Sequence, residues 1–550
     1  MTEQSPGAPH AGDLTIGGAL ERGVDRFAEH PWMGFRDEVR TFERLGADVE
    51  AIARGLAALG LEHGERLGLF MDNRFEWLET EYAATALGAW LVPLNTWFRF
   101  RELEHVLSES GMQVLVWTDP LLGRRTADLL LELLPELEEA RPGAWKSERF
   151  PQLRTVVGIG EGPWPSGVLP WDELLRMGAA TSDADLSAAR RRVAADDIGL
   201  LMYTSGTTGR PKGAMIRHRS VVGHISTWAR HLQLRGDDRS IMSSPLFWSF
   251  GCTLNALVPL HCGSMIALQE RYDPLRFLQD LVRYDCTHLQ GVPSQYEMAL
   301  KHADSLDYDL SRLRLVQIGG SASAEGLARR ILDRAPHAQF VSAYGLTEAV
   351  GVNTYTDLDD PLEAVMQTVG HAARDNELAV KVPEGHEDVA AGEVGELCIR
   401  GENVMAGYLD NPEATSAALR GGWLRTGDLA VMDEAGYVRI VGRHVDAYKR
   451  GGVNVYPAEA EALIGEHPSV QAVAIVGVPD DRLGEIGAAF VLARPGTVVD
   501  HDEIRAFCAG RIAAYKVPER VIALDELPVT PTGKVQKFVL KEQYARGSGR

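Results

Sequence analysis

The 550-residue chain has little cysteine, no long hydrophobic run and fewer basic than acidic side chains. Its five cysteines lie far apart without a CxxC pair, which argues against a zinc site or disulfide framework and favours free thiols. The longest nearly apolar stretch, residues 82–94, is too short to span a bilayer. The polar amino terminus, MTEQSPGAPHAGD, lacks the apolar core of a signal peptide. We therefore expect a cytoplasmic protein without a transmembrane segment.

Basic charge is also too sparse for a general nucleic-acid surface. The chain has 56 Lys plus Arg against 77 Asp plus Glu, a net charge of −21, whereas phosphate backbones require clustered basic residues. The run at residues 190–192, three arginines, is too short to change this balance. With 45% hydrophobic and 24% charged residues the chain is expected to fold, and small molecules rather than nucleic acids are its expected partners. Whether it forms a homo-oligomer stays open.

A chain of this length exceeds what one hydrophobic core organises, so at least two folding units are expected. From about residue 64 to 345, strand-like runs alternate with helical patterns such as 123–138 and 274–284, which predicts parallel sheets covered by helices. After about residue 370 the pattern is β-rich, and the last hundred residues resemble a compact α+β unit. The expected fold is α/β, with a large domain over 1–444 and a small domain over 445–550.

The stretch YTSGTTGRPKG, residues 203–213, combines glycines and hydroxyl side chains with two basic residues after an apolar run. Glycine and proline occur too often for a helix or strand, but backbone N–H groups of such a turn can converge on an anion. Lys212 adds a positive charge. The pattern differs from GxxxxGK[ST], since Gly213 follows Lys212. A polyphosphate-binding loop is therefore predicted.

This stretch resembles the signature of the adenylate-forming superfamily, which comprises acyl-CoA synthetases, non-ribosomal adenylation domains and beetle luciferases. Further motifs occur in the family's order over nearly the whole chain, and their pattern is most similar to acyl-CoA synthetases. They are SAYGLTEA (342–349), GELCIRGENVMAGY (395–408), WLRTGDLA (423–430), GRHVDAYKRGGVNVYPAE (442–459) and PVTPTGKVQKF (528–538).

The resemblance implies a reaction in which a carboxylate and ATP give an acyl-adenylate and pyrophosphate, with Mg²⁺, and coenzyme A then accepts the acyl group. Glu348 would be the metal ligand. Lys534 would act catalytically together with Thr204 and Glu348, as a cation that the mobile small domain brings to the reacting phosphate. The residues implied for the phosphates are Thr204, Ser205, Gly206, Thr207, Thr208, Gly209 and Lys212.

Other positions are implied for the rest of the nucleotide and for coenzyme A. Tyr344 would stack on adenine, and Asp428 with Arg443 would bind the ribose. Ser321 and the following alanine depart from the alanine–proline that is commoner in the family. The remaining nucleotide positions are Gly320, Ala343, Gly345 and Thr347, and those on the coenzyme A side are Lys449, Gly451 and Gly452.

The acyl pocket is expected to be mostly apolar or small, which favours a hydrophobic aliphatic or aryl acid. Trp248 stands where CoA synthetases of the family commonly have histidine, and Ser249 stands where amino-acid-activating relatives carry an aspartate. An α-ammonium group would then be unpaired, which disfavours α-amino acids. Val445 replaces the usual polar residue at the pivot between the domains. The pocket positions are Trp248, Gly251, Gln290, Val292, Gly319, Ala349 and Val352.

Three functions remain open at this point. The leading hypothesis is an ATP-dependent acid:CoA ligase. The alternative is an adenylate-forming amide synthetase or a stand-alone ligase that loads a carrier-protein phosphopantetheine, since both would keep every ATP motif. The third is a binding homologue without catalysis, against which the intact Glu348 and Lys534 argue. No carrier domain is expected after residue 538, because only a short charged tail follows.

Overall fold

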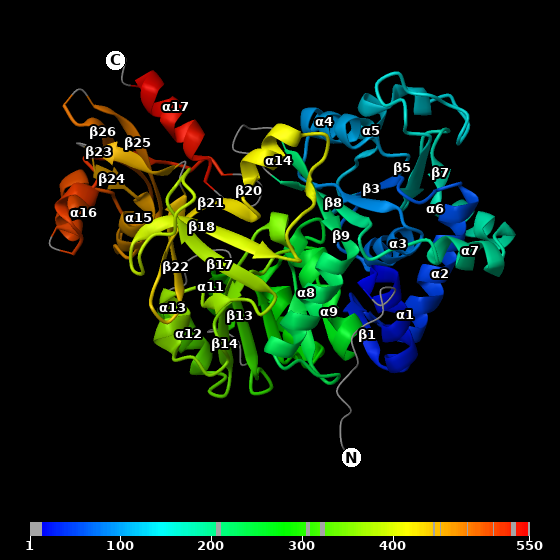
Figure 1. Cartoon of the computed structure of the whole chain (residues 1–550), viewed down its shortest axis with the longest axis horizontal. Helices are drawn as coiled ribbons and strands as arrows, with labels where there is room; N and C mark the ends of the chain where they lie inside the picture. The colour runs from blue at the N-terminus through cyan, green and yellow to red at the C-terminus, as the bar shows by residue number, and fades with distance from the viewer. Residues whose placement is uncertain are drawn as a thin grey trace. The chain divides into compact units, whose positions relative to one another are not determined.

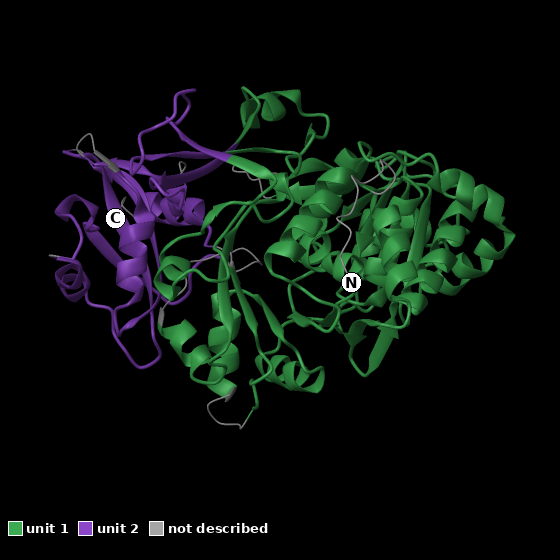
Figure 2. Cartoon of the chain, turned by 60° about the horizontal axis from the view of Figure 1, so that its bottom comes forward, with its two compact units in different colours: residues 1–377, 399–424 green, residues 378–398, 425–550 purple. Residues whose placement is uncertain are grey.

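The computed structural model divides into two compact units (Figure 2). Unit 1 contains residues 1–377 and 399–424, and unit 2 contains residues 378–398 and 425–550. The boundary expected near residue 445, between a large and a small domain, stays a prediction. The described ranges are 14–204, 211–303, 308–319, 325–443, 446–450, 453–480, 482–509, 511–529 and 535–547.

Unit 1 contains two large sheets with helices between and around them (Figure 1). Within the described ranges, sheet A has nine strands, parallel from β14 to β1 and antiparallel at both edges. Its order is β16 (His371–Ala372), β15 (Thr354–Tyr355), β14 (Gln339–Tyr344), β13 (Leu315–Gly319), β12 (His288–Gly291), β10 (Arg239–Met242), β11 (Met265–Leu268), β1 (Pro31–Phe35), β2 (Glu38–Thr41).

Sheet B is parallel from β8 to β7, and antiparallel pairing adds β9 and β19 at its edge. Helices α3, α4, α5, α10 and α11 each follow a buried strand, which agrees with the predicted α/β fold. The order of sheet B is β19 (Gly407–Tyr408), β9 (Lys212–Arg217), β8 (Ile198–Thr204), β4 (Trp90–Pro93), β3 (Arg66–Phe70), β5 (Val114–Thr118), β6 (Thr155–Ile159), β7 (Leu169–Pro170).

The end of helix α5 in unit 1 is set by a single proline. The expected helix 123–138 is instead α5, which ends at Leu133, because Pro135 cannot continue an α-helix and starts a 3₁₀ turn. The helices are α1 (Ile16–Phe27), α2 (Phe42–Ala58), α3 (Phe75–Ala86), α4 (Phe100–Ser110), α5 (Ala127–Leu133), α6 (Trp171–Met177), α7 (Asp183–Arg190), α8 (His218–His231), α9 (Val258–Cys262), α10 (Pro274–Arg283), α11 (Pro293–Ala303), α12 (Glu325–Leu332), α13 (Leu362–Gln367) and α14 (Pro412–Ala418).

One face of sheet A is buried against α10, α11 and α12. One hydrophobic cluster joins residues of these helices to Ile241, Leu289, Val316 and Ile318. Val316 and Ile318 are two positions apart on β13, so both point to this face. Asp273 caps α10 by accepting a hydrogen bond from the Arg276 amide. The alternation leaves the residues between these positions pointing to the other face of the sheet.

Unit 2 contains most of sheet C and all of sheet D. Sheet C consists of β17 (Asn376–Lys381), β18 (Val394–Gly401), β21 (Trp423–Met432), β20 (Leu419–Arg420) and β22 (Val438–Arg443), and the boundary between the units falls within β17, β18 and β21. Sheet D consists of β24 (Val453–Val455), β23 (Tyr448–Arg450), β26 (Gly484–Ala493), β25 (Val470–Asp480) and β27 (Arg520–Leu524). The helices of unit 2 are α15 (Pro457–Gly465), α16 (His501–Cys508) and α17 (Lys537–Gly547). Sheet D and these three helices form the α+β unit that was expected for the last hundred residues.

All five cysteines are free thiols, and four of them are buried, which confirms the expectation from their spacing. Among the described helices, none combines the length and the apolar character needed to cross a membrane.

Candidate active site

Glu348 lies just beyond the carboxyl end of β14, in the 3₁₀ turn Thr347–Ala349. The hydroxyl of Tyr408 donates to Glu348 Oε1 at 3.0 Å, and the amide of Met405 donates to the Glu348 backbone oxygen at 2.8 Å. Burial and the adjacent Glu348 carboxylate raise the pKa of Tyr408, so its hydroxyl keeps the proton that it donates. The carboxylate is therefore oriented from a second element, β19.

Tyr408 also connects Glu348 to the strand that follows the glycine-rich stretch. Tyr408 and Ala214 are register partners in β19 and β9, and Lys212 Nζ lies 5.4 Å from the centre of the Tyr408 ring. Thr204, at the end of β8, is in turn the register partner of Lys212. The structure thus brings Thr204, Lys212 and Glu348 into one chain of contacts through Tyr408. Tyr408 was missed because the sequence offered it only as the last residue of a structural motif.

The backbone after β14 is tightly folded. A Cβ at Gly345 would lie 1.5 Å from the backbone oxygen of Gly351, so only glycine fits there. The amide of Asn353 donates to the Tyr344 backbone oxygen at 2.7 Å, and its side chain donates to the backbone oxygen of Ala349 at 2.8 Å. These bonds hold the turn that carries Thr347 and Glu348.

The same turn contacts the expected acyl segment. The hydroxyls of Ser249 and Thr347 lie 3.3 Å apart, within hydrogen-bonding distance. A Cβ at Gly251 would lie 2.4 Å from the backbone oxygen of Pro245, which explains glycine at the start of the π-helical turn η4 (Phe250–Asn255). Ala349 and Val352 are buried nearby in sequence. The segment that carries Trp248, Ser249 and Gly251 therefore contacts the turn that carries Glu348, through Ser249 and Thr347.

Trp248 is one of three aromatic side chains that pack edge to face. Its ring centre lies 5.3 Å from that of Trp97 and 5.6 Å from that of Phe247, and the Trp97 and Phe247 centres are 5.3 Å apart. Trp97 comes from the segment after β4, far away in the sequence. Sequence reasoning missed it, and an isolated tryptophan before a helix carries no signal of such a contact.

The other described acyl and nucleotide positions lie at the carboxyl ends of the central strands of sheet A. Gln290 is in β12, and Val292 follows that strand. Gly319 ends β13 as the register partner of Ala343 in β14, one residue before Tyr344. Parallel sheets bind ligands at this edge, so these positions agree with the expected geometry.

Asp428 lies in unit 2, on β21, opposite its register partner Arg443 on β22. Arg443 Nε donates to Asp428 Oδ1 at 3.0 Å. The side chain of Asp428 is 9% exposed and that of Arg443 53% exposed. The predicted ribose pair is thus together, and its role stays a prediction.

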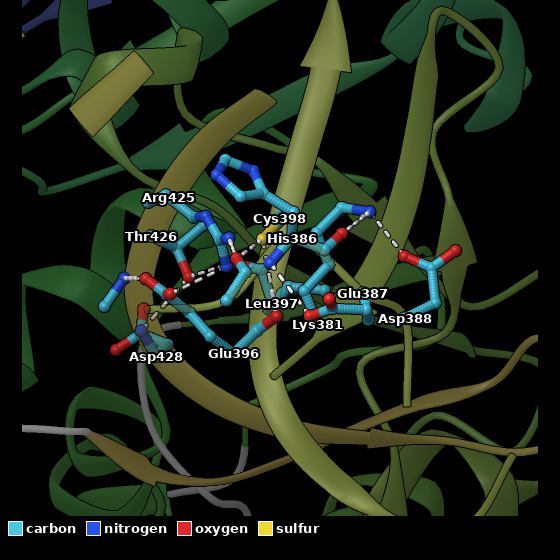
Figure 3. Close-up of polar contacts among 12 residues, drawn as sticks. Lys381, His386, Glu387, Asp388, Glu396, Leu397, Cys398, Arg425, Thr426 and Asp428 are labelled. Atoms are coloured by element: carbon cyan, nitrogen blue, oxygen red, sulfur yellow. Dashed lines mark hydrogen bonds and ion pairs between the residues drawn. The ribbon is translucent and has the colours of Figure 1, made fainter. Parts of the chain in front are cut away.

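A polar network fixes the turn that precedes Asp428 (Figure 3). The Thr426 hydroxyl donates to the Leu397 backbone oxygen at 2.8 Å and accepts from the Asp428 amide at 3.1 Å. Glu396 Oε1 accepts from the Gly427 amide at 3.1 Å. Thr426 and Gly427 are therefore held against β18, and Asp428 is held in turn by Thr426.

Arg425 completes this network. Its Nη1 lies 3.0 Å from Glu396 Oε2, and the two side chains are 7% and 12% exposed. The guanidinium also donates to the Gly385 backbone oxygen and to Cys398 Sγ. Burial raises the pKa of Cys398 to about 11, which keeps this thiol protonated at neutral pH. Glu396 and Arg425 were missed although both lie within quoted motifs (395–408 and 423–430), because the sequence does not show that they pair with each other.

Lys449 is on the hairpin of β23 and β24, with an exposed side chain and a backbone amide that donates to Glu485 Oε2 at 2.8 Å. The neighbouring Arg450 forms an ion pair with Glu519. Of the predicted positions, the following lie outside the described residues and keep their predicted roles: Ser205, Gly206, Thr207, Thr208, Gly209, Gly320, Ser321, Gly451, Gly452 and Lys534, together with Val445 of the pivot.

The described residues contain no group of three or more His, Cys, Asp or Glu side chains able to hold a metal ion. A single carboxylate such as Glu348 nevertheless fits Mg²⁺, which keeps several waters and commonly combines one or two carboxylates with substrate phosphates. Glu348 as a metal ligand therefore stays a prediction, for a metal that is bound together with a nucleotide.

Comparison with known proteins gives two family matches. The AMP-binding enzyme family matches residues 20–409, and the AMP-binding enzyme C-terminal domain matches residues 459–534. A Bacillus subtilis (strain 168) protein named as an acyl-CoA synthetase, YngI, is 37% identical to this chain over 532 residues. The match covers 96% of this chain and 97% of YngI. The human mitochondrial medium-chain acyl-CoA ligase ACSF2 is 34% identical over 546 residues, covering 98% and 88%. The crystal structure of the anthranilate CoA ligase AuaEII with anthranoyl-AMP superposes with a TM-score of 0.85 at 27% identity, covering 98% of each chain.

Proposed function

Because this chain belongs to the AMP-binding enzymes of the adenylate-forming superfamily and is an acid–thiol ligase, we propose that it activates a hydrophobic carboxylic acid as acyl-AMP. Pyrophosphate leaves in this step, and the acyl group then passes to the thiol of coenzyme A. The observation that supports this most directly is the contact chain from Thr204 and Lys212 through Tyr408 to Glu348. It joins the predicted phosphate and metal residues of three separate motifs.

In the first half-reaction the protein must hold two anions, the carboxylate and ATP, in line. Lys212 and Thr204 bind or steady the phosphates, and Tyr408 holds the Glu348 carboxylate in place. Glu348 would bind Mg²⁺, which when present neutralises charge on the phosphates. The ammonium group of Lys534 stabilises the negative charge that develops at the α-phosphate as the bond to pyrophosphate breaks.

Asp428 and Arg443 bind the ribose hydroxyls in this proposal, and Tyr344 stacks on adenine. In the second half-reaction the acyl carbon is attacked by the coenzyme A thiol and AMP leaves. Lys449 lies on the hairpin proposed for coenzyme A, where its exposed ammonium suits a phosphate. The small domain that carries this hairpin is proposed to begin near residue 445. The whole protein is proposed to act in the cytoplasm.

The wall formed by Trp97, Phe247 and Trp248 favours an aliphatic or aryl acid. A bare methylene difference in such a pocket changes selectivity by only about 1–3 kcal/mol, so several related acids are expected to react. Ser249 offers no charge to an α-ammonium group, so α-amino acids are expected to be poor substrates.

The test is a panel of aliphatic and aryl acids scored for pyrophosphate release with and without coenzyme A. The expected result is Mg²⁺-dependent pyrophosphate release and an acyl-CoA product identified by mass. Amide formation with amines in the absence of coenzyme A, or acylation of a carrier protein only, would replace the proposed acceptor. No pyrophosphate release with any acid would contradict the proposed function.

A further inference from the structure

Two buried glutamines lie side by side on the central strands of sheet A. Gln290 in β12 and Gln317 in β13 are register partners, so their side chains point to the same face of the sheet. They are 1% and 0% exposed. Within the described part of the chain, Gln317 Oε1 and Nε2 and Gln290 Oε1 have no hydrogen-bond partner. Each unpaired buried polar group costs about 1–3 kcal/mol, and three such atoms gather on this one register pair.

The face on which these amides lie is the one not buried against α10, α11 and α12. Leu289 and Val316, the neighbours of the glutamines along their strands, belong to the hydrophobic cluster on the helix-covered face. The glutamines therefore point away from that cluster. Tyr296 donates to the backbone oxygen of Gln317 at 2.7 Å and so supports its strand without satisfying its side chain.

Gln290 is itself one of the predicted acyl-pocket positions, and Gln317 is its register partner. Gln317 is two residues before Gly319, the register partner of Ala343, and both belong to the predicted site. Two residues along a strand correspond to about 7 Å, on the same face. Gly319 has no side chain to separate the pocket edge from the amides below it. Along this face the amides therefore lie on the side of Gly319 that is away from the carboxyl ends of the strands.

We propose that Gln290 and Gln317 form a polar end of the acyl pocket that binds a hydroxyl group on an otherwise hydrophobic acid. The hydroxyl donates to an amide oxygen and accepts from Gln317 Nε2. A hydroxyl matches the set because the unpaired atoms include two acceptors and one donor. A ketone satisfies only the donor, and an alkyl chain satisfies none. This inference rests on the proposed function and narrows its substrate class.

The experiment compares acids of equal length that carry a hydroxyl, a ketone or only hydrogens at a carbon several bonds from the carboxylate, on alkyl and aryl frames. Pyrophosphate release gives kcat/KM for each acid with the full-length protein, Gln317→Leu and Gln290→Leu. The wild type is expected to prefer the hydroxy acid by about tenfold or more, because a site built for hydrogen bonds rejects analogues that lack them. Gln317→Leu should reverse this preference without changing the KM for ATP.

Thermal unfolding supplies a second measurement. Gln317→Leu removes unpaired polar atoms and should raise the Tm or leave it unchanged. The control Gln113→Leu removes an amide that is bonded at both ends, accepting from Arg66 and donating to Gly111, and should lower the Tm. A clear loss of Tm in Gln317→Leu would show that the amide is satisfied within the fold and would overturn the inference.

The outcomes separate the two proposals. Pyrophosphate release with equal kcat/KM for all three acids, or a hydroxyl preference that survives both Gln→Leu changes, overturns the polar end but leaves the ligase function intact. If no acid releases pyrophosphate, the proposed function fails. The Tm shift that each acid causes in the wild type and in Gln317→Leu then decides the inference: a shift specific to the hydroxy acid and to the wild type supports it, and equal shifts overturn it.

Discussion

The turn at Asp428 and the pair Gln290–Gln317 are both polar, and Asp428 and the two glutamines are buried, but the hydrogen bonding around them differs. Around the turn, the Gly427 amide, the Thr426 hydroxyl and the Arg443 guanidinium are all bonded to protein groups. The glutamine pair has three polar atoms without a partner among the described residues. A bonded turn is positioned before its ligand arrives, whereas an unpaired amide obtains its bonds from the ligand.

The same difference separates the residues proposed to bind the nucleotide from those of the proposed acyl pocket. The nucleotide residues are held by hydrogen bonds from other elements, as Tyr408 holds Glu348 and Glu396 holds Gly427. The acyl wall is held by ring packing between Trp97 and its neighbours. Directional bonds make the nucleotide contacts rigid, while shape alone leaves the acyl pocket adaptable. Substitutions on the two sides should therefore change different kinetic constants.

The largest effect is expected from Lys534→Ala on the nucleotide side. Loss of one cation that stabilises charge in the transition state should lower acyl-AMP formation by roughly 100- to 1,000-fold. ATP binding should stay near that of the wild type, because this cation acts on the reacting phosphate. ATP–pyrophosphate exchange and nucleotide titration measure the two quantities. The control is Lys541→Ala in α17, and near-normal exchange in Lys534→Ala would refute its catalytic role.

Glu348→Gln should have the next largest effect. The change keeps the shape of the side chain but removes the charge proposed for Mg²⁺, so ATP–pyrophosphate exchange should fall roughly 100-fold. The Mg²⁺ concentration that half-saturates nucleotide binding should rise, and calorimetric titration measures it without turnover.

Tyr408→Phe tests how Glu348 is held. It removes only the hydroxyl that donates to Glu348. Removal of such a supporting bond should raise the half-saturating Mg²⁺ concentration about tenfold, less than Glu348→Gln. An unchanged Mg²⁺ dependence in Tyr408→Phe would show that the bond does not position the carboxylate.

The elements that the sequence predicted well are those with a local cause. Helix α10 (Pro274–Arg283) agrees with the pattern expected over 274–284, because its cap, its proline and its apolar spacing all lie within the segment. Strand β14 (Gln339–Tyr344) likewise lies at the end of the region, up to about residue 345, in which strand-like and helical runs were expected to alternate. The helix expected over 123–138 was wrong before Ala127 and beyond Leu133, and at the second end Pro135 outweighs the leucine pattern.

Contacts between distant residues could not be predicted from a single sequence. Tyr408 and Glu348 are 60 positions apart, and the bond between them depends on the pairing of β19 with β9. The glutamine pair exists only through the register of β12 and β13. Motifs identify residues that touch a common ligand, whereas register and packing decide which side chains support them.

Glu396→Gln is expected to weaken the nucleotide side without touching the nucleotide. It keeps an acceptor for the Gly427 amide but leaves the buried Arg425 without its countercharge. Breaking a buried pair costs about 3–5 kcal/mol of stability, so the Tm should fall. The turn at Asp428 should loosen and raise the KM for ATP roughly tenfold, with the KM for the acid unchanged.

Glu377→Gln is the matched control for this change. It breaks a second Glu–Arg pair on the same sheet, with Arg400, whose side chains are 63% and 47% exposed. Exposed pairs contribute little to stability, so neither the Tm nor the KM for ATP should change measurably. Equal effects of the two substitutions would show that burial of the Glu396–Arg425 pair has no special role.

The smallest effect is expected on the acyl side, from Trp97→Leu. Trp97 contacts both Phe247 and Trp248 edge to face, and each such contact is worth about 0.5–1.5 kcal/mol beyond burial. The KM for a hydrophobic acid should rise roughly threefold, and the KM for ATP should not change, because the wall does not contribute to the nucleotide contacts. Phe98→Leu, which alters a residue packed against a different cluster, is the control. A rise in the KM for ATP with Trp97→Leu would mean that the aromatic wall also positions the nucleotide, and the two regions would then act as one.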